Sequence, residues 1–157
     1  MSKTVRPQGS LKRSSANADS YRIIDVNLNR SKEGLRVCED IARFHLKDLK
    51  ITKKLGRIRH RLAYIVRGSG IDRLMLLKHR DPGRDLGKDF SRGPKRRTFK
   101  GIFIANSQRV KESLRVLEEF SKLLDLGASK KIQRLRFDFY ALEKETFERF
   151  PALLDSR

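Results

Sequence analysis

Apolar residues recur along the chain at intervals of three and four positions, the spacing of one face of an α-helix. The pattern is clearest in two segments, 53–65 (KKLGRIRHRLAYI) and 130–142 (KKIQRLRFDFYAL), which align at an offset of 77 residues. Their apolar stripes consist of Leu55, Ile58, Leu62 and Ile65 in the first segment and of Ile132, Leu135, Phe139 and Leu142 in the second. The spacing predicts two amphipathic helices that bury the same face.

A second pair of segments repeats polar residues as well as apolar ones. Residues 27–39 (NLNRSKEGLRVCE) and 106–118 (NSQRVKESLRVLE) are identical at eight of thirteen positions, at an offset of 79. The chain therefore has the pattern of a duplicated helical hairpin, with repeats at about 21–70 and 100–150.

Glycine and proline mark the ends of four predicted helices, at about 21–46, 52–67, 101–124 and 129–150. Ser129 is the expected N-cap of the last of these helices, and a short helix is expected at 71–78. One hairpin cannot bury its apolar stripe alone, so the two hairpins must pack together. The sequence predicts an all-α bundle of four main helices, built from two repeated hairpins with pseudo-two-fold symmetry.

Length and charge define the domain organisation. Of the 157 residues, 20–157 are expected to form a single helical domain, and 1–19 a disordered basic leader, with a targeting segment as the alternative. The net charge of +19 indicates a polyanionic partner, and much of it lies in the leader and in the basic loop 78–99. No apolar run is long enough for a membrane helix, and the single Cys38 is expected in the core of a cytoplasmic protein.

Two polar pairs fall inside the apolar arcs of the predicted helices. A helical projection places Asn27 and Arg30 in the arc of the first helix and Asn106 and Arg109 in that of the third. Buried polar groups are costly unless they are paired. The repeated pair therefore predicts a shared central ligand site; the alternative is that each Asn caps or cross-links helices while each Arg pairs with a nearby Glu.

Two further groups of residues are candidates for the site. Glu33 with Arg36, and Glu112 with Arg115, are expected to form ion pairs that support the site. The loop GRDLGK places Arg84, Gly87 and Lys88 close to Arg80, where basic side chains could fold over phosphates. Asp81 and Asp85 could hold Mg²⁺ or organise the arginines, and a solvated surface loop is the alternative.

The motifs D-x-N-x-N-R-x-x-E-x-L-R-V-x-E-D and R-D-x-x-x-D-x-G occur here as DVNLNRSKEGLRVCED and RDPGRDLG. In this combination the chain resembles the hydroxymethylpyrimidine-phosphate kinase family, a small all-helical domain often fused ahead of thiamine-phosphate synthase. The resemblance covers roughly 20–150. It implies transfer of the γ-phosphate of ATP, with Mg²⁺, onto hydroxymethylpyrimidine phosphate, yielding the diphosphate for thiamine biosynthesis.

On this resemblance, roles are assigned to the matching residues. Arg30 and Arg109 are expected to clamp phosphate, and Asn27 and Asn106 to position the pyrimidine or its phosphate. ATP is expected to contact Arg80, Arg84, Gly87 and Lys88, and catalysis is assigned to Arg30, Arg109, Arg80 and Asp81. Further substrate contacts are expected from Glu33, Glu112, Arg36 and Arg115. The expected Mg²⁺ ligand is Asp25, Asp81 or Asp85.

The competing prediction is a non-catalytic basic module that binds nucleic acid or docks on thiamine-phosphate synthase. The basic loop contains only Phe90 and Phe99 as aromatic residues, which disfavours nucleic-acid binding. The expected partners are therefore a phosphorylated pyrimidine and ATP, with no membrane. Docking on a separate synthase, and assembly into a homo-oligomer, are left open by the sequence.

Overall fold

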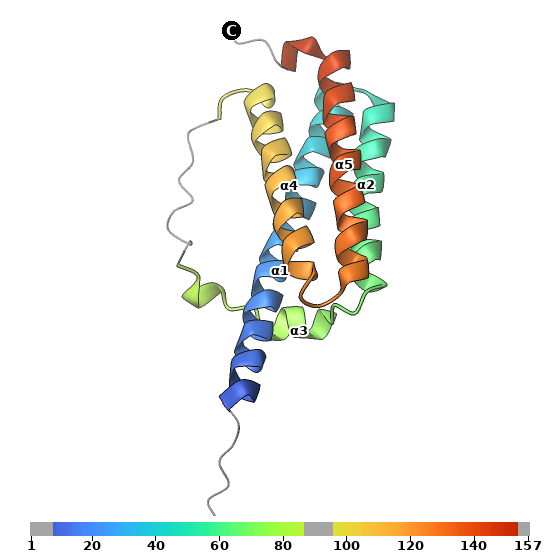
Figure 1. Cartoon of the computed structure of the whole chain (residues 1–157). Helices are drawn as coiled ribbons and strands as arrows, with labels where there is room; N and C mark the ends of the chain where they lie inside the picture. Colours follow the sequence, from blue (N-terminus) through green and yellow to red (C-terminus); the bar gives the residue numbers. More distant parts are fainter. Residues whose placement is uncertain (1–7, 87–95, 154–157) are drawn as a thin grey trace, which may run out of the picture.

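The computed structural model describes residues 8–86 and 96–153, with side chains from residue 17 onward. Four long helices lie side by side, and a short helix, α3, crosses one end of the bundle (Figure 1). The helical elements in chain order are α1 (Gln8–Asp40), a π-helix (Ile41–His45), α2 (Leu49–Arg67), α3 (Arg73–Lys78), a 3₁₀ turn (Pro82–Arg84), α4 (Phe99–Ser121), α5 (Leu126–Arg149) and a 3₁₀ turn (Pro151–Leu153). The predicted all-α bundle is confirmed, since the described residues contain no strand.

The apolar stripes of α2 and α5 form the core that their spacing predicts. Each stripe residue of both helices is at least nine-tenths buried. These side chains meet the apolar face of α1 and that of α4, where Ile24, Leu35, Val110 and Leu114 are fully buried. The core therefore lies between the two hairpins, and neither hairpin would bury its stripe alone.

Helices α1 and α4 run antiparallel and approach each other closely at the centre of the bundle. The Ser31 hydroxyl hydrogen bonds to the Ser113 hydroxyl over 2.7 Å. A Cβ atom on Gly34 would lie 2.8 Å from a methyl carbon of Val110. At the repeat offset of 79, Ser31 corresponds to Val110 and Gly34 to Ser113, so each contact is the repeat-related copy of the other. The two contacts therefore flank the pseudo-two-fold axis.

The second helix of each hairpin begins at an aspartate N-cap. Asp48 accepts a hydrogen bond from the Ile51 amide (2.8 Å), and Asp125 accepts one from the Ala128 amide (2.9 Å). The predicted cap at Ser129 is therefore wrong. The Ser129 hydroxyl lies inside α5 and donates instead to a backbone carbonyl of α4.

The first helix begins earlier than the sequence predicts. It starts at Gln8 and projects beyond the end of the bundle, so it includes most of the predicted disordered leader (Figure 1). The described helix thus covers 8–19 of the predicted leader, and residues 1–7 lie outside the described residues. Residues 8–40 contain no proline, so nothing in that stretch interrupts the helical hydrogen bonds. Within the described residues, no helix has the length and apolarity that crossing a bilayer requires.

The close approach of α1 and α4 makes Gly34 sensitive to substitution. We expect Gly34→Ala to lower the free energy of unfolding by about 1–3 kcal/mol, because its methyl group would press on Val110 and on the Asn106 carbonyl. Gly56→Ala in α2 is the matched control. Its methyl would lie 3.4 Å from its nearest neighbour, a Glu39 carboxylate oxygen, at ordinary contact distance. Urea titrations in which the two variants are equally destabilised would contradict this packing.

Cys38 is a core residue, as the sequence predicts. It is completely buried, and burial raises the pKa of its thiol to about 12. The reactive thiolate is therefore scarce near neutral pH. We expect a disulfide reagent at pH 8 to label the folded chain at least about 100-fold more slowly than the chain in guanidinium chloride. Comparable labelling rates in the two states would show that the thiol is accessible.

Candidate functional site

A cavity of about 590 Å³ lies between the middle of α1 and the segment that follows α3. The α1 residues along its wall are spaced by three and four positions, so they project from one side of the helix. Residues 80–85 form the opposite wall. The polar residues that line the cavity are Asp19, Arg22, Asp25, Asn29, Arg30, Arg80, Asp81 and Asp85.

The two walls are joined by a bidentate ion pair. Both carboxylate oxygens of Asp25 accept hydrogen bonds from the Arg80 guanidinium, each over 2.7 Å. Asp25 is buried, whereas the Arg80 side chain is 44% exposed. These hydrogen bonds raise the pKa of Arg80 above its ordinary value. The pairing holds the guanidinium at the cavity in a defined orientation and leaves part of it open to a ligand.

The cavity combines cations and carboxylates. Arg22, Arg30 and Arg80 could neutralise an anion there. Asp81 caps the 3₁₀ turn by accepting a hydrogen bond from the Arg84 amide, and its carboxylate lies 3.7 Å from the Arg84 guanidinium. A surface of this composition suits a phosphorylated ligand, because cations contact phosphate oxygens while carboxylates share a divalent cation with them.

The three predicted Mg²⁺ ligands do not form a ready-made metal site. Among the described residues, no cluster of three or more acidic, histidine or cysteine side chains is arranged to hold a metal. Asp25, Asp81 and Asp85 all line the cavity, but both oxygens of Asp25 are engaged by Arg80. Mg²⁺ commonly uses one or two carboxylates together with substrate phosphates, and Asp81 and Asp85 could serve in that way.

The repeated asparagines face inward as predicted, but they do not converge. Each donates to the carbonyl four residues earlier, Asn27 over 2.9 Å and Asn106 over 2.8 Å. Asn106 lies at the level of Cys38, which contacts its neighbour Ser107 and lies 11 residues from Asn27 along α1. At 1.5 Å per residue, the asparagines are about 16 Å apart along the bundle. Each side chain bonds back to its own helix in a separate place, so the asparagines neither share a site nor cap or cross-link helices.

The repeated arginines do not face the core. Arg30 and Arg109 are both exposed, and only Arg30 lines the cavity. The prediction of one central site is therefore wrong in its geometry. The apolar arc of α1 is broad because this helix packs against both α2 and α4, and a long arginine at the edge of the arc reaches solvent.

The other repeated charges do not form the predicted pairs of Glu33 with Arg36 and of Glu112 with Arg115. Arg36 lies 3.6 Å from Glu39, and Arg115 lies 2.7 Å from Glu118, so both arginines form ion pairs within their own helices. The predicted glutamates Glu33 and Glu112 are exposed and do not line the cavity; Glu112 accepts a hydrogen bond from Gln108.

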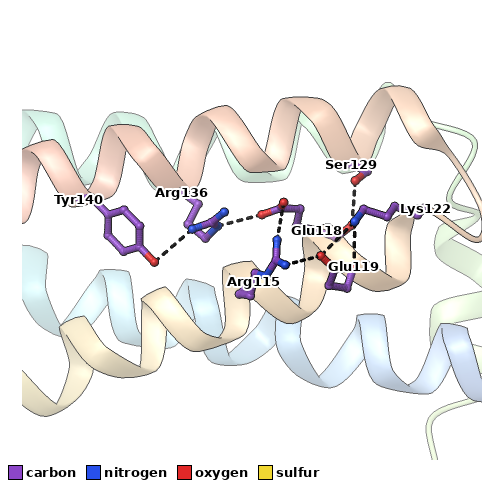
Figure 2. Close-up of polar contacts among 7 residues, drawn as sticks. All are labelled: Arg115, Glu118, Glu119, Lys122, Ser129, Arg136 and Tyr140. Carbon is purple, nitrogen blue, oxygen red and sulfur yellow. Dashed lines mark hydrogen bonds and ion pairs between the residues drawn. The ribbon is translucent and has the colours of Figure 1, made fainter.

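The most deeply buried of these charges is Glu118. Figure 2 shows its carboxylate between Arg115 of α4 and Arg136 of α5, with Tyr140 beyond Arg136. Arg136 donates to Glu118 over 2.8 Å and to the Tyr140 hydroxyl over 3.1 Å. The first hairpin contains the same arrangement, in which Arg59 of α2 donates to Glu39 over 2.9 Å. The repeated pair therefore joins the two helices of each hairpin.

Some cavity residues were missed from the sequence, and some candidates cannot be placed. Asp19 and Arg22 line the cavity. The sequence pattern that could have identified them is their spacing of three and four residues along the helix with Asp25 and Asn29. Gly87 and Lys88 lie outside the described residues. Arg84 is exposed, and beside Asp81 it lies at the edge of the site.

Comparisons with known proteins match this chain to one family. The model of the ThiD2 family matches residues 22–145. A thiamine-phosphate synthase of Nostoc punctiforme is 36% identical over 78% of this chain, one of Rhodopirellula baltica is 36% identical over 82%, and one of Prochlorococcus marinus is 39% identical over 78%. The chain spans about a third of the length of these relatives (34%, 35% and 34%). No solved structure matches it.

The buried network in Figure 2 predicts a large effect on stability. We expect Glu118→Ala to lower the free energy of unfolding by about 3 kcal/mol, because Arg136 would be left nearly buried without its carboxylate. Glu148→Ala removes an exposed carboxylate 3.7 Å from Lys144 and should leave the urea midpoint unchanged. Equal midpoints for both variants would show that the network does not support the hairpin.

Proposed function

The chain belongs to the ThiD2 family, the family that its motifs indicate, and on this premise we propose that it is a kinase of thiamine biosynthesis. The proposed reaction transfers the γ-phosphate of ATP onto hydroxymethylpyrimidine phosphate and yields the diphosphate. The observation that carries the proposal is the cavity, in which Arg80 is oriented by the buried Asp25 and faces arginines of α1.

The chemistry of this transfer explains why such a cavity would suffice. An oxygen of the substrate phosphate attacks the γ-phosphorus of ATP, and the bond from that phosphorus to the oxygen shared with the β-phosphate breaks. ADP leaves with the bonding electron pair. The attacking oxygen is already anionic near neutral pH, so little general-base help is needed. The barrier comes mainly from repulsion between two anions, and positive charge in a fixed position lowers it.

The cavity residues divide into two roles in this proposal. Arg22, Arg30 and Arg80 contact the phosphates and reduce the repulsion between them, and Asp25 positions Arg80 through its two hydrogen bonds. Asp81 and Asp85 would hold Mg²⁺ together with phosphate oxygens. When it is bound, Mg²⁺ supplies further positive charge to the phosphates.

An assay with purified protein, ATP, Mg²⁺ and the pyrimidine monophosphate tests the proposal, with ADP and the diphosphate separated by chromatography. We expect Arg80→Ala to lower kcat/KM about 100-fold or more, because a charge that contacts the transferred group is lost. Arg109→Ala is the matched control, since it removes the exposed, repeat-related arginine outside the cavity. Its turnover should stay within about twofold of the unmodified protein.

Two controls make the outcome decisive. Circular dichroism establishes that each variant is folded, and Arg22→Ala provides a second cavity variant that leaves the Asp25–Arg80 pair intact. Absence of the diphosphate product from folded, unmodified protein would overturn the kinase proposal. Salt-sensitive binding to nucleic acid without turnover of ATP would instead favour a non-catalytic basic module.

A further inference from the structure

Lys32 is a repeated residue whose surroundings differ between the two hairpins. Its counterpart in the second hairpin, Lys111, forms an ion pair with Glu143 over 2.9 Å. Lys32 is partly buried on α1, yet among the described side chains no carboxylate lies within ion-pair distance of it. Lys32 therefore stands without the counter-charge that the duplicated fold provides elsewhere.

The cause of this difference can be read from the repeat. At the offset of 77 that relates α2 to α5, Glu143 corresponds to Val66, which is buried. In place of an acid, the positive charges of Arg67 and Arg73 act on Lys32. Burial and these two arginines lower the pKa of the Lys32 ammonium, while Asp25 opposes the shift. In the folded chain, the surroundings of Lys32 therefore disfavour its charged ammonium form.

Lys32 lies on α1 just beyond the cavity, and its side chain is not among those that line the cavity. Asp25, Asn29 and Lys32 are spaced by four and three residues and therefore follow one another along one side of the helix. Asp25 and Asn29 line the cavity. Side chains on a helix lean towards its N-terminus, so the Lys32 side chain leans towards Asn29.

We propose that Lys32 binds a phosphate group of a ligand held in the cavity. The inference rests on the proposed function for the nature of this ligand, a phosphorylated substrate. A cation without an acidic partner, next to a cavity lined by arginines, is poorly placed for stability and well placed for an anion. A bound phosphate would provide the counter-charge that Glu143 provides to Lys111.

A matched pair of variants separates a binding lysine from a structural one. Lys32→Met should leave the melting temperature unchanged or raise it, because a partly buried cation among cations is removed. Lys111→Met should lower the melting temperature, because Glu143 would lose its partner. The two repeat-related substitutions are thus expected to act in different directions on stability.

Ligand binding is measured by titration calorimetry, with inorganic pyrophosphate and Mg²⁺-ATP as probes. We expect Lys32→Met to weaken the affinity for at least one probe about tenfold, and Lys111→Met to leave both affinities unchanged. A second variant, Val66→Glu, places an acid at the position that corresponds to Glu143, and it should also weaken binding in protein that circular dichroism shows to be folded. Lys32→Met protein that binds both probes as tightly as the unmodified chain would overturn the inference, and so would unmodified protein that binds neither probe.

The turnover assay keeps this inference separate from the kinase proposal. If Lys32→Met binds the probes more weakly while the unmodified protein yields no diphosphate product, the phosphate contact is supported and the kinase proposal is overturned. If Lys32→Met has normal turnover and normal probe binding, the kinase proposal is supported and the proposed phosphate contact of Lys32 is overturned.

Discussion

The close antiparallel packing of α1 against α4 is the constraint on which the rest of the structure depends. Each hairpin has one apolar stripe to bury, and only the other hairpin can cover it. The two helices approach closely because Gly34 presents no side chain to Val110 and because Ser31 and Ser113 pair their hydroxyl groups. This packing buries one side of α1 and leaves another side, towards its N-terminal end, to meet the segment after α3.

Duplicated ion pairs and helix caps form the scaffold. Glu39 with Arg59, and Glu118 with Arg136, join the two helices of each hairpin, and Asp48 and Asp125 cap the second helix of each. A buried ion pair of this kind adds little net stability over an apolar pair, but it is costly to break. The same pair occurs in both hairpins, where it joins corresponding helices.

The candidate site lies where the two hairpins differ. At the offset of 79, Gly101 stands at the position of Arg22, and Ile104 at that of Asp25. The second hairpin therefore has neither the buried carboxylate that orients Arg80 nor the neighbouring arginine. One of the two related surfaces therefore carries these polar groups, and the other does not.

The pattern along the chain determined the helical class, the duplicated hairpins and the buried stripes of α2 and α5, because periodicity and turn residues are local properties. It also indicated the family and brought Arg80, Asp81 and Asp85 forward as candidates. It could not tell scaffold from site, since Asn27 and Arg30 looked equally misplaced in a projection of a single helix. That distinction needed the neighbours of each side chain.

Only the tertiary structure decided that Asn27 donates to its own helix, that Arg30 reaches solvent, and that Asp25 pairs with Arg80 from a segment 55 residues away. The physical reason is that the burial and charge of a side chain depend on several elements at once, and those elements come together only when the two hairpins pack.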